Sequence, residues 1–227
     1  GKKLVGTILE TIAREVDKCS SFQGFLIFNS LGGGTGSGLG SQLVEQMSAE
    51  YPKTPKFGFT VYPSNRFSTS TVEPYNAMMG NRELSEHQDA LFVFENEHLY
   101  NICMNQLGIE KPTYSNINRL IAQVASSFTA PLRFEGSLNF RLREFASSLI
   151  PFPKLNYIMP SYSPLVPPQQ TLSETSTVTD ITEGAFLPEN CMAAADLSKG
   201  KFLAATSLYR GDVTFKEDVA ALSAKKK

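Results

Sequence analysis

Short apolar runs alternate with longer segments of helical periodicity along the first half of the chain. The continuous apolar run at 25–28 predicts a strand buried on both faces, and runs at 57–62 and 90–94 predict two further strands. Between them, apolar residues recur every three or four positions, which predicts helices at the start of the chain, after residue 38, around 73–79 and at 97–107. Strands that alternate with helices in this way are typical of a parallel α/β sheet with right-handed connections.

Each predicted helix carries an apolar stripe. In the first two helices the stripes consist of Leu4, Ile8, Ile12, Val16 and Cys19, and of Leu39, Leu43, Val44 and Met47. A longer helix is expected after Pro112, with apolar positions at Leu120, Ile121, Val124, Ala125 and Phe128. Because this helix has few polar faces, we expect it to be buried between two layers, with Ile121 and Val124 toward the sheet. A further helix is predicted at 139–149, before Pro151.

The pattern of apolar and polar residues changes near Leu155. Two short apolar runs, at 157–159 and 202–208, are separated by stretches rich in Pro, Ser and Thr. The segment 164–179 predicts a long exposed loop, and such loops in compact proteins are usually functional. The sequence begins within a helical pattern and ends without a distinct tail composition, so we expect it to be an internal part of a longer protein.

Composition and charge narrow the functional classes. Of the 227 residues, 41% are hydrophobic, which is enough for a substantial core. The net charge of -1 gives no electrostatic attraction to nucleic acid or to anionic membranes, and no apolar run is long enough to cross a bilayer. Cys19, Cys103 and Cys191 are far apart and lack metal-ligand spacing, which favours a reduced, intracellular setting. We therefore expect no nucleic-acid partner and no membrane partner.

The candidate chemistry lies in a glycine-rich segment between the first predicted strand and the next helix. Gly32 to Gly38 contains five glycines in seven positions, so its backbone N–H groups are open to the oxygens of an anion at a helix N-terminus. Thr35 and Ser37 add hydroxyl donors. No Lys-Ser or Lys-Thr pair follows and no register satisfies G-x-G-x-x-G, so the Walker A and dinucleotide fingerprints are absent. The alternative is a flexible turn, although a turn alone would not need five glycines.

The string GGGTGSG at 32–38 resembles the phosphate-binding loop of the tubulin family. The resemblance continues in order along essentially the whole chain, through Val72-Glu73-Pro74-Tyr75-Asn76, Asn96-Glu97, Pro112-Thr113-Tyr114, Asn118-Arg119-Leu120, Leu132-Arg133-Phe134 and Tyr209-Arg210-Gly211. Glu144 and the segment 209–213 are most similar to the α-type members. The resemblance implies a partial parallel-sheet GTP-binding domain at 1–95. Residues 96–134 would then form a linker helix and a long core helix. A partial mixed α+β intermediate domain would follow at 135–227, with a boundary near Phe134.

The resemblance also implies a GTP site. The phosphates would be surrounded by Gly33, Gly34, Thr35, Gly36 and Ser37, with Ser30 and Thr69 at the same site. Glu73 would accept hydrogen bonds from the ribose, Asn96 and Asn118 would read the guanine edge, and Tyr114 would stack on the base. As alternatives, Glu73 and Asn96 could be helix caps, and Tyr114 could be a core residue. Magnesium (Mg2+) would be held by residues that precede this sequence.

Glu144 carries the implied catalytic role. In the family, the helix that contains it faces the nucleotide of the next subunit, where a carboxylate can orient and polarise the attacking water. The alternative is a solvated helix residue. Arg141 stands where the family usually has a second carboxylate, and because the two residues are three apart on one predicted helix, we expect Arg141 and Glu144 to share a face and pair.

The function implied by the resemblance is that of a GTP-hydrolysing structural subunit of microtubules, in the cytoplasm and cytoskeleton. It would form a heterodimer with a β-type tubulin and supply Glu144 in trans to the partner's GTP. The loop from Pro164 to Ser176 would contact lateral neighbours, although Thr171-Leu172-Ser173 lacks the family's aromatic residue or His near the tip. The alternatives are a divergent FtsZ-like cytoskeletal GTPase and, from another class, a dinucleotide-dependent oxidoreductase. The oxidoreductase would need a Tyr-Lys or His-Asp set that is not apparent.

Overall fold

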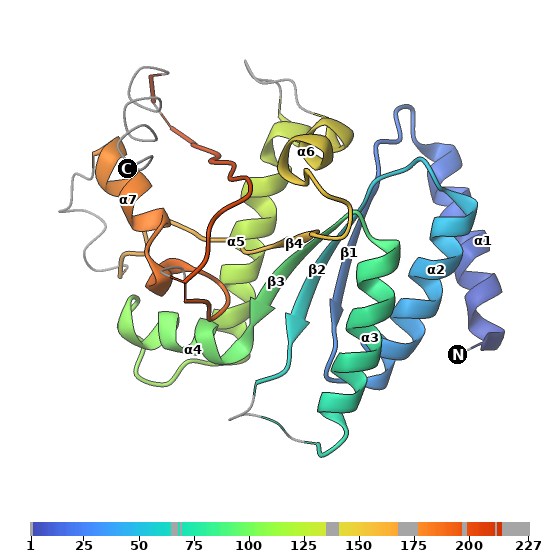
Figure 1. Cartoon of the computed structure of the whole chain (residues 1–227), viewed down its shortest axis with the longest axis horizontal. Helices are drawn as coiled ribbons and strands as arrows, with labels where there is room; N and C mark the ends of the chain where they lie inside the picture. Colours follow the sequence, from blue (N-terminus) through green and yellow to red (C-terminus); the bar gives the residue numbers. More distant parts are fainter. Residues whose placement is uncertain are drawn as a thin grey trace. The chain divides into compact units, whose positions relative to one another are not determined.

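The computed structural model describes residues 2–64, 68, 70–134, 141–167, 177–196, 199–211 and 213–214. The chain divides into two compact units (Figure 1). Unit 1 combines residues 1–94 with residues 131–158, and unit 2 combines residues 95–130 with residues 159–227. Neither unit is therefore a single continuous stretch of the chain.

Unit 1 is built on a four-stranded sheet. Its strands β1 (Phe25–Ser30), β2 (Lys56–Tyr62), β3 (Ala90–Glu95) and β4 (Tyr157–Ile158) lie in the order β1-β2-β3-β4. β1 and β2 are parallel, with Phe25 opposite Lys56, and β3 and β4 are parallel, with Leu91 opposite Tyr157. The predicted parallel α/β sheet is therefore confirmed. The helices of this unit are α1 (Lys2–Lys18), α2 (Gly40–Glu50), α3 (Glu73–His87) and α6 (Leu142–Leu149).

Apolar side chains cover both faces of this sheet. On one face, the residue that follows β1 and residues of α2, α3 and β3 form a buried cluster, which consists of Leu31, Val44, Leu84 and Leu91. Because alternate residues of a strand point to opposite faces, Phe92 lies on the other face. There the rings of Phe28, Phe59 and Phe92 stack across three strands, with centroids 4.7 and 4.6 Å apart. Phe145 of α6 approaches Phe57 on that face, so α6 packs against it.

Some sequence-based expectations for unit 1 are wrong in detail. The strand at 25–28 is not buried on both faces: Phe28 is 58% exposed, because β1 is the edge strand of the described sheet. In α1, Val5 is buried and Leu4 is exposed, since helical periodicity does not decide which of two adjacent apolar residues points inward. The helix around 73–79 continues to His87, because Gly80 and Leu84 extend its buried side beyond Met79.

Unit 2 contains α4 (Asn96–Asn105), α7 (Val178–Ala185), the short turn η2 (Pro188–Asn190) and most of α5 (Tyr114–Arg133). Leu120 and Val124 of α5 are buried, whereas Ile121 is half-buried and Ala122 is exposed. The expectation that this helix is buried between two layers is therefore wrong: α5 is amphipathic. Its buried residues follow the three-and-four spacing of a single helix face, and they are Ile117, Leu120, Val124 and Phe128.

The predicted loop at 164–179 ends earlier than expected, because α7 begins at Val178. Thr177 caps this helix: its hydroxyl oxygen accepts a hydrogen bond from the Asp180 N–H, and the Asp180 carboxylate accepts one from the Thr177 N–H. Residues 168–176, which hold the tip of the proposed lateral loop, lie outside the described residues. The run at 202–208 forms neither helix nor strand. Within the described ranges, no helix combines the length and apolarity needed to span a membrane.

The three cysteines are all free thiols. Cys19 is exposed just beyond the end of α1, whereas Cys103 and Cys191 are buried. Burial raises the pKa of both buried thiols above its ordinary value, because the thiolate is poorly solvated there.

Candidate functional site

The glycine-rich segment begins where β1 ends and runs directly into a helix. After Ser30, which is exposed, the chain passes Gly33 and Gly34 and winds into the π-helical turn η1 (Thr35–Leu39), which continues as α2. The first N–H groups of a helix have no partners within it. In the part of the chain that the structure describes, nothing accepts a hydrogen bond from the N–H of Gly33 or Gly34, and Gly34 and Thr35 are exposed. These donors are available to an anion.

The loop glycines fall into two kinds. A Cβ atom at Gly36 would lie 2.0 Å from the Ser30 carbonyl oxygen, so the close approach of η1 to β1 requires glycine there. At Gly33 and Gly34 an added Cβ would meet nothing within 4 Å. Positive φ angles among the described residues occur at Gly108 and Gly211, outside this loop. Packing and turn geometry therefore do not explain Gly33 and Gly34, whereas access of an anion to their N–H groups does.

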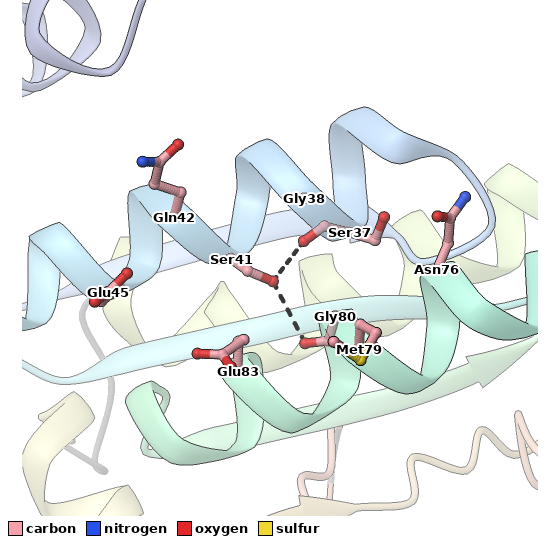
Figure 2. A pocket seen from close by; sticks show the side chains of 9 residues that line it. All are labelled: Ser37, Gly38, Ser41, Gln42, Glu45, Asn76, Met79, Gly80 and Glu83. Carbon is pink, nitrogen blue, oxygen red and sulfur yellow. Dashed lines mark hydrogen bonds between the residues drawn. The ribbon is translucent and has the colours of Figure 1, made fainter. Parts of the chain in front are cut away.

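Ser37 shapes the loop from within. Its N–H and its hydroxyl both donate to the Gly33 carbonyl oxygen, at 3.1 and 2.8 Å, and the residue is buried. The Ser41 hydroxyl, one turn later, bridges the carbonyl oxygens of Ser37 and Gly80, which ties η1 to α3 (Figure 2). A Cβ at Gly80 would come within 3.0 Å of Leu31 and Ser37. The absence of a side chain on Gly80 therefore lets α3 pack directly against the loop.

Glu73 lies beside the glycine loop. It is the first residue of α3 and is half-buried, and its carboxyl group lies 3.7 Å from the position of a Cβ atom built on Gly32. The N-cap of α3 is Val72, so Glu73 is not the capping residue. Unit 1 thus brings a carboxylate, a hydrogen-bond acceptor suited to hydroxyl groups, next to free backbone donors.

The residues expected to recognise a base belong to unit 2. Asn96 is the first residue of α4, whose N-cap is Glu95, so Asn96 is not its cap. Tyr114 and Asn118 are four residues apart on α5 and therefore share a face of that helix. Tyr114 is 60% exposed, which excludes the core-residue alternative, and its ring meets Tyr100 edge-to-face at 6.3 Å. Thr69 lies outside the described residues.

Glu144 points away from the packed side of α6. It is exposed in the first turn, whereas Leu142 and Phe145 on the same helix are buried. The predicted pairing with Arg141 is wrong. Arg141 occupies the N-cap position with an extended backbone, and none of the ion pairs between described residues joins it to Glu144.

Three potential metal ligands of unit 1 cluster on α3. Glu83, Glu86 and His87 place three ligand atoms within 4.8 Å of one another, and they form the one such group in the described residues. They occupy the last turns of α3, and Glu83 lines the same pocket as Ser37 and Asn76 (Figure 2). The position of a magnesium site stays a prediction.

Two residues at this site carried no role in the sequence interpretation. The side-chain amides of Asn29 and Asn76 donate to the carbonyl oxygens of Gly36 and Gly32, at 3.2 and 3.1 Å. Asn29 precedes the loop on β1 and Asn76 follows Glu73 by one helical turn. Asn29 follows the apolar run 25–28 in β1, close to the glycine loop, and this polar position was the signal that the sequence offered. For Asn76 no local pattern reveals the contact.

Two family models match the chain. Residues 1–104 match the model described as Tubulin/FtsZ family, GTPase domain, and residues 153–227 match the model described as Tubulin C-terminal domain. The first match includes the glycine loop, Glu73 and Asn96. Tyr114, Asn118 and Glu144 lie between the two matched ranges.

Proposed function

We propose that this chain, which belongs to the tubulin family, is an α-type subunit that holds GTP at its glycine loop and assembles with a β-type tubulin. Family membership makes it a tubulin-like or FtsZ-like cytoskeletal GTPase. The α-type identity, the β-type partner and a place in cytoplasmic microtubules are the finer parts of the proposal. They rest on Glu144 and on the segments that resemble α-type members.

One observation supports the GTP site above the others: the open N–H groups of Gly33 and Gly34 at the start of η1. Neither glycine is required by packing, and a helix N-terminus adds a favourable dipole for negative charge. Phosphate oxygens are the ligands that such a loop accommodates. Glu73, whose carboxyl group lies beside Gly32, is proposed to accept hydrogen bonds from the ribose hydroxyls.

Recognition of guanine is assigned to unit 2. An amide offers both a donor and an acceptor, so Asn96 and Asn118 suit the mixed edge of guanine. The exposed ring of Tyr114 offers an aromatic face for the base. Magnesium is assigned to the phosphates and to residues outside this sequence, and lateral contacts are assigned to the loop that begins at Pro164.

Hydrolysis is proposed to be completed in trans. Glu144 is exposed on α6, so its carboxylate is free to accept a hydrogen bond from a water molecule on a neighbouring subunit's GTP. Orienting and polarising that water is the role of the carboxylate. The absence of an Arg141–Glu144 ion pair between these described residues leaves the Glu144 carboxylate uncommitted to Arg141.

Nucleotide extraction and chromatography of the full-length protein test the proposal. We expect GTP or GDP and neither ATP nor NAD. Adenine nucleotide alone, or a dinucleotide, would contradict the GTP assignment. Assembly assays then separate the two cytoskeletal alternatives: an α-type subunit forms a stable heterodimer with β-type tubulin, whereas an FtsZ-like protein assembles without it.

A further inference from the structure

We propose that Asn29, Thr60 and Asn76 are positioning residues that hold the carbonyl groups of the glycine loop away from the phosphates, so that its N–H groups face them. The inference rests on the proposed GTP site. It assigns a role to three side chains that need not touch the nucleotide, and all three belong to unit 1.

The first contact fixes the start of the loop. Asn76 of α3 donates its Nδ2–H to the Gly32 carbonyl oxygen at 3.1 Å. In a trans peptide the C=O of one residue and the N–H of the next point in opposite directions. Holding the Gly32 oxygen toward α3 therefore directs the Gly33 N–H to the other side. No acceptor for that N–H is found among the described residues.

The second contact fixes the end of the loop. Asn29 of β1 donates its Nδ2–H to the Gly36 carbonyl oxygen at 3.2 Å. Gly36 also packs closely on β1, where an added Cβ would lie 2.0 Å from the Ser30 carbonyl oxygen. The turn η1 is thus fixed to the sheet both by packing and by a hydrogen bond. With its oxygen bonded to Asn29, the Gly36 carbonyl group is directed at the sheet and not at a phosphate, which it would oppose electrostatically.

A third residue orients the Asn29 amide. The hydroxyl of Thr60 on β2 donates to Asn29 Oδ1 at 2.9 Å, and Thr60 is fully buried. An amide carries its donor and its acceptor on opposite sides, so a donor at Oδ1 leaves Nδ2 facing Gly36. The two hydrogen bonds therefore connect Thr60 on β2, through Asn29 on β1, to Gly36 in the loop. Because Thr60 is buried and donates to Asn29 and not to the loop itself, its effect on a nucleotide is indirect.

The experiment compares ligands that differ in their phosphates. Asn76→Leu and Thr60→Val each remove one hydrogen-bonding group at nearly constant volume, and Thr60→Ser restores the hydroxyl. Met78→Ala is the matched control, since Met78 is exposed on α3 and makes none of these contacts. In the full-length protein, equilibrium binding of guanosine, GDP and GTP is measured for each variant.

We expect Asn76→Leu and Thr60→Val to weaken GDP and GTP binding by about 3- to 10-fold, the size of one net hydrogen bond. Guanosine binding should remain within about twofold of wild type, and Thr60→Ser and Met78→Ala should behave as wild type. Equal losses for guanosine and GTP, or no loss at all, would overturn the positioning role while leaving the GTP site intact. Wild-type protein that binds no guanine nucleotide would overturn the proposed function as well.

Discussion

At the scale of single residues, the glycine loop contains both packed and open glycines. Gly36 has no room for a side chain, whereas Gly33, Gly34 and Gly38 have open space around their Cβ positions. In the sequence these glycines are indistinguishable, because the difference depends on the approach of Ser30 from the preceding strand. A glycine-rich loop between a strand and a helix was predictable from the sequence, but which of its glycines are packed and which are open was not.

This division predicts opposite effects for two substitutions. Gly36→Ala should lower the free energy of unfolding by about 1–3 kcal/mol, because the new methyl group would overlap a backbone oxygen that cannot move aside. Gly33→Ala should leave stability unchanged or raise it by about 0.4–1 kcal/mol, yet weaken GTP binding by crowding the free N–H groups. Thermal unfolding and nucleotide binding of both variants measure this. A Gly33→Ala protein with wild-type GTP affinity would show that the open loop does not bind phosphate.

The catalytic proposal predicts a separation between binding and hydrolysis. In copolymers with a β-type partner, Glu144→Ala should leave the chain's own GTP binding intact. It should slow polymer-stimulated hydrolysis at the partner's site by about 10²-fold or more, as expected for the loss of a group that activates water. Rates of phosphate release measure this effect. Ser148→Ala, another exposed position on α6, serves as the control.

Arg141 refines this experiment. Because it caps α6 and does not pair with Glu144, Arg141→Asp should leave the hydrolysis rate close to wild type. Faster hydrolysis in Arg141→Asp would mean that an arginine–glutamate pair forms in the polymer. Unchanged hydrolysis in Glu144→Ala would end the trans-catalytic proposal.

At the scale of elements, local pattern predicted which segments are helices and strands better than it predicted which faces are buried. The runs at 57–62 and 90–94 became β2 and β3 almost unchanged. α3 was underestimated because its second half, with Asn81, Arg82 and Glu83, has little apolar content while Leu84 still reaches the core. In α5, the apolar residue Ile121 lies off the buried stripe. The buried face of a helix depends on the elements that pack against it, and these cannot be identified from the sequence of the helix itself.

The burial of α5 predicts a graded response to one aspartate placed at three positions. Val124→Asp should lower the free energy of unfolding by several kcal/mol, about 3–5, because an unpaired carboxylate would replace a buried methyl pair. Ile121→Asp should cost less, since Ile121 retains access to water. Ala122→Asp is the exposed control, and it should cost less than about 1 kcal/mol, the difference in helix propensity between the two residues.

Denaturant titration of the three aspartate variants gives their order. Equal losses for Val124→Asp and Ile121→Asp would indicate that α5 is buried on both sides. A loss in Ala122→Asp as large as that in Val124→Asp would contradict the amphipathic character of the helix altogether.

At the scale of the whole molecule, long-range pairing decides what the local pattern cannot. β4 joins the sheet through Leu91 and Phe92 of β3, far away in sequence, and α6 returns to the same unit to pack on Phe57. β4 has only two residues, and the aromatic contact of α6 produces no pattern in the sequence. The return of α6 and β4 to unit 1 was therefore not predictable from the sequence alone. The domain limits at 95 and 134 stay predictions. The same reasoning explains why Asn76 was assigned no role: its partner lies 44 positions away.

The free side of β1 predicts self-association of the 227-residue chain when it is produced by itself. β1 is the edge of the described sheet, and the exposed ring of Phe28 lies on it. An apolar edge strand with unpaired backbone groups is a template for pairing with another chain. Light scattering should detect oligomers, and Phe28→Lys should reduce them, because a charge on an edge strand disfavours such pairing. A monodisperse wild-type chain would contradict this.

The unequal burial of the three thiols has a practical consequence for spectroscopy. Cys19 is exposed beyond α1, whereas the two buried thiols have raised pKa values and little thiolate for an alkylating reagent to meet. A maleimide dye supplied in limiting amount will therefore attach to this chain at one defined position without any engineering. Cys19 lies in unit 1, as the glycine loop does, so the dye would report from the unit that is proposed to hold the phosphates of GTP.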